Sequence, residues 1–122
     1  MTGFPAFVTE LLEGLGPVRV RRMFGGAGVY ADDVMFGLID DEVLYLKTDE
    51  ALRAELAAEG SVSWVYGGRG GPLEQTSYWS VPETALDDPD EAVAWARKAL
   101  AVARAKAAAN PKKRRKGSLP PV

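Results

Sequence analysis

The 122-residue sequence contains no cysteine and no histidine. The first absence excludes disulfides, thiolate nucleophiles and cysteine-based zinc clusters, and the second excludes every acid, base or metal ligand that relies on imidazole. No apolar run of about eighteen residues is present to span a bilayer, and no basic leader precedes the first apolar stretch. We therefore expect a cytoplasmic protein with no cofactor, no metal and no membrane contact.

Acidic residues are missing from Ala92 onward, although the formal net charge of the whole chain is only −2. Residues 1–91 hold all 17 acidic residues and six basic ones, a net charge of −11, and the remainder holds nine basic residues. This asymmetry predicts an acidic body with a basic appendage. The chain is long enough to bury about two-thirds of its unfolded surface, so it should fold without disulfides or a metal.

Helical periodicity appears in three places. A first helix is predicted over 4–15, a short one over 49–58 with Thr48 or Asp49 as its cap and Gly60 as its end, and a last one from about Asp88 to Asn110. The first has an apolar stripe of Phe4, Phe7, Val8, Leu11, Leu12 and Leu15. The last should leave the sheet near Lys106, which falls on its apolar side.

Between the helices the period of the apolar residues changes to two, which is typical of strands. Strands are predicted near 18–24, 27–31, 34–39, 43–47, 62–66 and 76–81. Turns at Gly25–Gly26, Asp32–Asp33 and Asp40–Asp41 make the first four an antiparallel meander. Val34, Phe36 and Leu38 are expected to share one face.

The predicted fold class is therefore α+β: an antiparallel sheet of a four-strand meander plus two further strands, packed with an N-terminal, a short middle and a C-terminal helix. We expect one domain over residues 1–109 and a basic, proline-containing, disordered tail over 110–122.

The most distinctive segment is Arg21–Tyr30, RRMFGGAGVY. Its candidate interaction residues are Arg21, Arg22, Phe24, Gly25, Gly26, Gly28 and Tyr30. Strict alternation would turn Arg22 toward the apolar side, where its charge would need a carboxylate or a bound anion. A bulge near Arg21–Arg22 that lets both side chains reach water is the favoured interpretation.

The glycines of this segment invite comparison with a phosphate-binding loop, but no Gly-Lys-Ser/Thr follows and they lead into a strand, so a tight turn is favoured. A small anionic ligand held by Arg22, Lys47 and Tyr30 remains an alternative.

Arg69, in the glycine-rich loop 67–72, sits either on a mobile binding lid or on a simple connection. Trp64, Tyr66, Tyr78 and Trp79 line a groove or pack across two strands. The paired aspartates suit turns and helix starts, not catalysis or calcium.

Five consecutive cations stand in the predicted tail: Lys112, Lys113, Arg114, Arg115 and Lys116. If all five contact phosphates, log affinity for nucleic acid should fall with log salt at a slope of about −4.5. Such binding would not depend on base sequence. A solvated tail, or one that folds back on the acidic body, explains the run equally well.

Several motifs together resemble the N-terminal domain of the TfoX/Sxy family of bacterial regulators. They are RRMFGGAGVY at 21–30, MFGL at 35–38, LYLKTD at 44–49, SYWSVP at 77–82 and the helix that contains Trp95. The resemblance covers about residues 4–108 and implies a compact α+β domain and a role in transcriptional regulation linked to natural competence. Full-length members carry a second, C-terminal domain, where this chain has its short basic tail, which implies a stand-alone N-terminal domain. The resemblance supplies no catalytic residue.

We therefore expect a non-enzymatic regulatory or interaction domain that contacts one or more protein partners through its sheet or through Arg21–Tyr30. The alternatives are a protein that binds nucleic acid non-specifically through the tail and a domain that binds a small anion. An unpaired edge of the sheet also makes a homodimer plausible.

Overall fold

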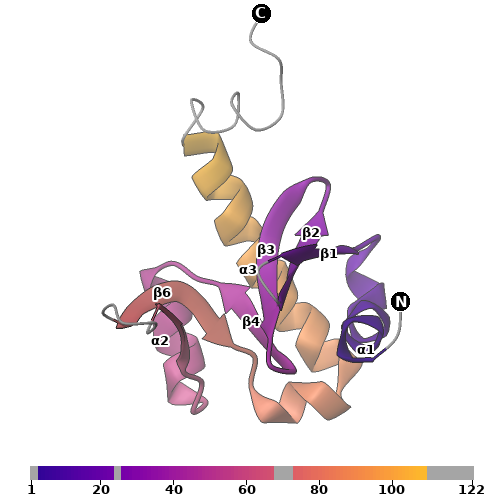
Figure 1. The fold of residues 1–122 in the computed structure, drawn as a ribbon, viewed down its shortest axis with the longest axis horizontal. Coiled ribbons are helices and arrows are strands. Elements are labelled where there is room, and N and C mark those ends of the chain that lie inside the picture. The colour runs from indigo at the N-terminus through magenta and orange to yellow at the C-terminus, as the bar shows by residue number, and fades with distance from the viewer. Residues whose placement is uncertain (1–2, 24–25, 68–72, 110–122) are drawn as a thin grey trace, which may run out of the picture.

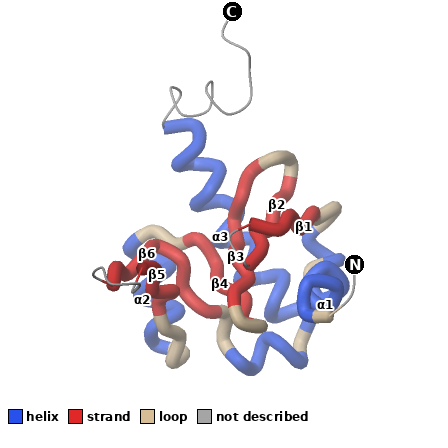
Figure 2. Tube along the Cα trace, viewed as in Figure 1, coloured by secondary structure: helices blue, strands red, loops and turns tan. Residues whose placement is uncertain are grey.

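The structure, a computed structural model, describes residues 3–23, 26–67 and 73–109. The described residues form three α-helices and one sheet. Figure 1 shows the helices around the curved sheet, and Figure 2 separates helices from strands by colour. The elements in chain order are α1 (Phe4–Leu11), the 3₁₀ helix η1 (Glu13–Leu15), β1 (Arg19–Met23), β2 (Gly26–Ala31), β3 (Val34–Asp40), β4 (Val43–Lys47), α2 (Glu50–Ala58), β5 (Ser63–Gly67), β6 (Leu73–Ser80), the 3₁₀ helix η2 (Glu83–Asp87) and α3 (Pro89–Ala109).

The six strands form one sheet in the order β1-β2-β3-β4-β6-β5, and every neighbouring pair is antiparallel. The predicted α+β class and the four-strand meander are both confirmed. Strands β1 and β5 are the two edges of the sheet. The predicted strand ends are correct to within a residue through β4, whereas β6 begins three residues earlier than expected.

Two tight turns shape the meander. Asp32 and Asp33 have φ angles of 51° and 65°, and Asp41 and Glu42 have φ angles of 51° and 59°. Positive φ at both central residues is the geometry that matches the twist of the flanking strands, and aspartate tolerates it better than most residues. The second turn thus lies one residue later than predicted. The predicted Gly25–Gly26 turn extends outside the described residues.

All three helices contribute to a single core with one face of the sheet. The apolar residues Val29, Phe36, Leu44 and Leu46 are each at most 1% exposed and come from β2, β3 and β4. The same core contains Leu12, which follows α1 directly, and the helix residues Val8, Leu11, Leu52, Leu56, Ala92, Ala96, Ala99, Leu100 and Ala103. Phe7 was expected in this stripe, but it is 38% exposed, because it lies at the margin of the narrow buried side of α1.

Helix boundaries follow their local chemistry. The Asp49 carboxylate accepts a hydrogen bond from the backbone N–H of Leu52 and caps α2, and Asp88 does the same for Asp90 and Glu91 at the start of α3. At the other end of α3, Ala103 is the last buried residue and Lys106 is exposed, as predicted. The final turns of α3 continue beyond the sheet (Figure 1).

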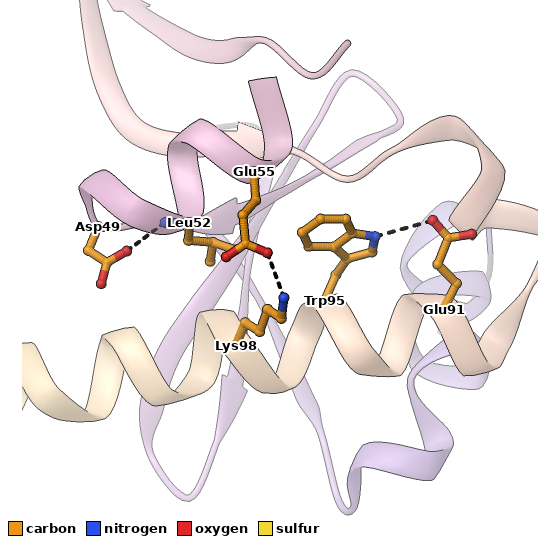
Figure 3. A network of polar contacts seen from close by, with 6 residues as sticks. All are labelled: Asp49, Leu52, Glu55, Glu91, Trp95 and Lys98. Carbon is orange, nitrogen blue, oxygen red and sulfur yellow. Dashed lines mark hydrogen bonds and ion pairs between the residues drawn. The ribbon is translucent and has the colours of Figure 1, made fainter. Parts of the chain in front are cut away.

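Polar contacts fasten α2 to α3 on the helical side (Figure 3). Lys98 donates to Glu55 across 2.6 Å, and its ammonium group lies 5.2 Å from the centre of the Trp95 ring. The Trp95 indole N–H donates in turn to Glu91. These side chains orient the two helices over the same face of the sheet.

One prediction about the sheet is wrong. Val34, Phe36 and Leu38 do not share a face, because the register between β2 and β3 shifts: Val29 pairs with Gly37, but Tyr30 pairs with Met35. Phe36 is the extra residue of this β-bulge and enters the core, whereas Leu38 lies on the opposite face beside Gly28.

Candidate functional site

A second set of side chains lies on the side of the sheet opposite the core, which we call the open face. It comprises Arg19, Arg21, Met23, Gly28, Tyr30, Met35, Leu38, Tyr45, Lys47 and Tyr78, as the pairing registers require. None of these residues belongs to the core cluster, which takes up the buried residues of all the described helices. The open face is therefore the broad part of the described sheet without a helix packed on it.

Two cation–tyrosine contacts mark the open face. The guanidinium carbon of Arg21 lies 5.9 Å from the centre of the Tyr30 ring, and the Lys47 ammonium lies 5.1 Å from the centre of the Tyr78 ring. Lys47 also donates a hydrogen bond to the Ser77 hydroxyl, 2.9 Å away. Each such contact contributes about 0.5–1 kcal/mol at an exposed site, so they fix positions more than they stabilise the fold.

Burial raises the pKa of Tyr78 above its ordinary value of 10.0, and the charge of Tyr30 raises it further. Burial also raises the pKa of Tyr45, with smaller contributions from the carboxylates of Asp40 and Asp41. A tyrosine that serves as a base needs a lowered pKa, so both shifts run against that role.

Acidic side chains lie near both ends of the open face. At one end Arg19 forms an ion pair with Asp33, and at the other end the carboxylates of Asp40 and Asp41 lie close enough to Tyr45 to raise its pKa. The indole N–H of Trp64, from β5, donates to Asp40 across 3.1 Å.

Gly28 shapes the middle of this surface. A Cβ atom at this position would lie 2.9 Å from the Tyr30 ring and 3.1 and 3.2 Å from the sulfur atoms of Met23 and Met35. Only glycine lets these three side chains close over the backbone. Glycine is needed at position 26 for a different reason, because an added Cβ atom would overlap the backbone carbonyl oxygen of Ile39. Gly26 and Gly28 therefore both serve close packing.

The structure separates the two adjacent arginines. Pairing of β1 with β2 is regular from Arg19 to Met23, so the bulge predicted near Arg21–Arg22 is wrong. Arg21 pairs with Gly28 and lies on the open face, whereas Arg22 pairs with Ala27 and lies on the helical side. Both side chains are exposed all the same, because β1 is an edge strand.

This separation also changes the anion-binding hypothesis. Arg22 does not converge with Lys47 and Tyr30, since it points to the other side of the sheet. The β1 cations that share the open face with them are Arg19, which is paired with Asp33, and Arg21. Among the described residues, no cluster of acidic side chains could hold a metal ion, and no helix has the length and apolar character needed to cross a bilayer.

The remaining sequence-predicted positions divide into two groups. Phe24, Gly25, Arg69 and the run Lys112–Lys116 lie outside the described residues. The aspartate pairs lie at turns and a helix start, as expected: Asp32 and Asp33 form the turn between β2 and β3, and Asp88 caps α3. Beyond that expectation, Asp33 pairs with Arg19 and Asp32 with Arg104. Tyr78 and Trp79 point to opposite faces, so they do not line one groove.

The sequence reasoning missed Met23, Met35, Leu38 and Tyr45 as parts of one surface. The alternation of side chains along 43–47 already predicts that Tyr45 lies on the opposite face of the sheet from Leu44 and Leu46, so the sequence could have identified this residue. Met35 and Leu38 lie on the same face only because the register between β2 and β3 shifts, and no local sequence pattern indicates that shift.

Comparison with known proteins agrees with these motifs. No curated protein gave a match to the chain. A profile of the TfoX N-terminal domain matches residues 10–103, which include the whole sheet and most of α3. The RRMFGGAGVY segment thus supplies most of β1 and β2, with Arg21 and Tyr30 of the open face, within the matched region, and the chain belongs to the TfoX N-terminal domain family.

Proposed function

We propose that this protein is a non-enzymatic regulatory domain that acts through protein contacts made by the open face and the adjoining strand β1. Membership of the TfoX N-terminal domain family supports a regulatory role. The observation that carries the proposal is the surface itself: Arg21, Tyr30, Lys47 and Tyr78 meet on the sheet face that the helices leave uncovered.

The chemistry of this surface suits recognition. Tyrosine and arginine are enriched where proteins bind one another, since each combines a large contact area with a polar end. A tyrosine phenol has an ordinary pKa of about 10, so Tyr78 is neutral and able to donate a hydrogen bond at physiological pH, and burial raises its pKa further. Regulation of transcription, in connection with natural competence, is the role we propose for these contacts.

The test is cross-linked capture of identified transcription proteins, such as RNA polymerase subunits and transcription factors, from a bacterial extract. The full chain should capture them, and the variant with both Arg21→Ala and Arg22→Ala should not. The matched control carries Arg53→Ala and Arg97→Ala, which remove two exposed cations from helices α2 and α3. Equal capture by both double variants would contradict the proposal, as would capture of no transcription protein by the full chain.

A second candidate function rests on the five adjacent cations at 112–116. Binding of nucleic acid through this run predicts a salt-sensitive gel shift that disappears when the chain is truncated at Asn110. A truncated chain that binds as tightly as the full chain would rule it out.

A further inference from the structure

We infer that β1 is a docking strand for an extended, acidic segment of a partner protein. The segment would extend the sheet by one strand and place adjacent carboxylates against Arg21 and Arg22. This inference rests on the proposed function, since it specifies the partner chemistry for part of the same surface.

The backbone of β1 is paired on one side alone within the described sheet. Its partner β2 matches it residue for residue from Arg19 to Met23, and β1 stands at the end of the strand order. A regular edge strand presents a row of N–H and C=O groups that another extended chain can pair with. The register has no bulge within β1 to interrupt that row.

The charges of β1 lie on both sides of this edge. Arg19 already forms an ion pair, because its guanidinium lies 2.6 Å from the Asp33 carboxylate. Arg21 and Arg22 are exposed and form no ion pair with any described residue, and they point to opposite faces of the sheet. Successive side chains of an added strand also alternate between the faces. Two consecutive acidic residues in that strand would therefore meet one arginine each.

A second copy of the chain fits this edge poorly. Pairing β1 with β1 of another molecule would bring several arginines together, and like charges opposite one another destabilise strand pairs. The other edge offers a contrast, because Val62 and Val65 leave the β5 region apolar and exposed at 60% and 44%. A charged edge resists self-association but still accepts a strand of opposite charge.

Nucleic acid fits the edge less well than an acidic peptide does. A phosphate backbone cannot continue the N–H and C=O pairing of a sheet. Residues 1–91 also carry a net charge of −11, which repels a long polyanion more strongly than it repels a peptide with two carboxylates. The edge thus selects a short acidic strand.

The test uses a fluorescein-labelled peptide of sequence Thr-Val-Glu-Glu-Val-Thr, titrated with the full chain and followed by fluorescence anisotropy. The peptide should bind, and its glutamine counterpart should bind about tenfold more weakly or worse. Arg21→Glu and Arg22→Glu should each raise the dissociation constant about tenfold. The control Arg53→Glu makes the same charge change on α2 and should change it less than about twofold. Equal binding of the glutamine peptide, or equal effects of all three variants, would overturn the inference.

Two further peptides separate strand pairing from simple charge attraction. One peptide is N-methylated at its odd-numbered residues and the other at its even-numbered residues. Alternate residues of an extended strand direct their N–H groups to opposite edges, so each peptide loses the N–H groups along one of its two edges. Strand addition predicts that one phase abolishes binding and the other retains it. Retention by both, or displacement of the acidic peptide from β1 by a thymidine oligonucleotide of equal charge, would contradict strand addition.

The outcomes for the two proposals are distinguishable. Arginine-dependent capture of transcription proteins without binding of the acidic peptide would refute the docking strand and leave the regulatory role supported. Binding of the peptide in one N-methyl phase, without capture of a transcription protein, would support the docking strand and refute that role.

Discussion

The two faces of the same sheet are built from different chemistry. The helical side carries aliphatic residues such as Leu44 and Leu46, which are at most 1% exposed. The open face carries tyrosines, methionines and cations that cover one another without a helix above them. The first face provides the free energy of folding through apolar burial, and the second provides chemical variety at the surface. Each prediction below tests this division.

The largest effect is expected from removing the same side chain on each face. Leu46→Ala should lower the free energy of unfolding by about 3–4 kcal/mol, since it leaves a cavity that the packed core cannot close. Leu38→Ala should cost about 1–2 kcal/mol, because Leu38 is also buried but lies on the open face, where neighbouring side chains can move into the space. Urea unfolding measures both values. Equal losses would mean that the two faces are equally rigid.

The glycines give a second comparison. Gly26→Ala should destabilise by about 3 kcal/mol, because its methyl group meets the Ile39 carbonyl and disturbs the pairing of β2 with β3. Gly28→Ala should cost about 1–2 kcal/mol, since it meets flexible methionine side chains and the Tyr30 ring. Gly14→Ala, where the nearest atom is 3.4 Å away, is the control with little effect. Thermal unfolding measures the loss of stability in each variant. A larger loss for Gly28→Ala than for Gly26→Ala would contradict the packing described.

The alkaline stability of the protein should report on the open face. Burial raises the pKa of Tyr78 in the folded state above 10.0, so the unfolded chain loses this proton at a lower pH. Stability therefore falls as the pH rises above about 10. Tyr78→Phe should reduce this fall, as measured by urea unfolding between pH 8 and 11. An unchanged pH profile in the variant would show that Tyr78 is as solvated when folded as when unfolded.

The smallest effect is expected at the exposed ion pair of Arg19 and Asp33. Their side chains are 61% and 84% exposed, so water screens the attraction despite the 2.6 Å separation. A double-mutant cycle with alanine at both positions should give a coupling energy of no more than about 0.5 kcal/mol. A coupling above about 1 kcal/mol would show that this end of the open face is held more firmly than its exposure implies.

Local patterns in the sequence predicted the elements well. Period-two alternation identified β1 to β4, and capping chemistry placed Asp49 and Asp88 at helix starts. These features depend on residues within a few positions of one another, so the local sequence contains the information. The family motifs likewise identified the TfoX N-terminal domain.

The candidate site was predicted less completely. Arg21, Tyr30 and Lys47 were named, but Arg22 was grouped with Lys47 although it lies on the other side of β1. The sequence determined that these side chains alternate along their strands. It did not determine which face of β1 the helices would cover, because that choice depends on α1 and α3, which are distant in the chain.

By itself, the sequence determined the order of helices and strands, the meander turns and an acidic body that ends in a basic run. Only the tertiary structure decided that β6 inserts between β4 and β5, that Phe36 turns inward at a bulge, and that Arg21 and Arg22 flank an open edge on opposite faces. The physical reason is that turns and periodicity are local, whereas strand order and register are chosen by the burial of apolar surface over the whole chain.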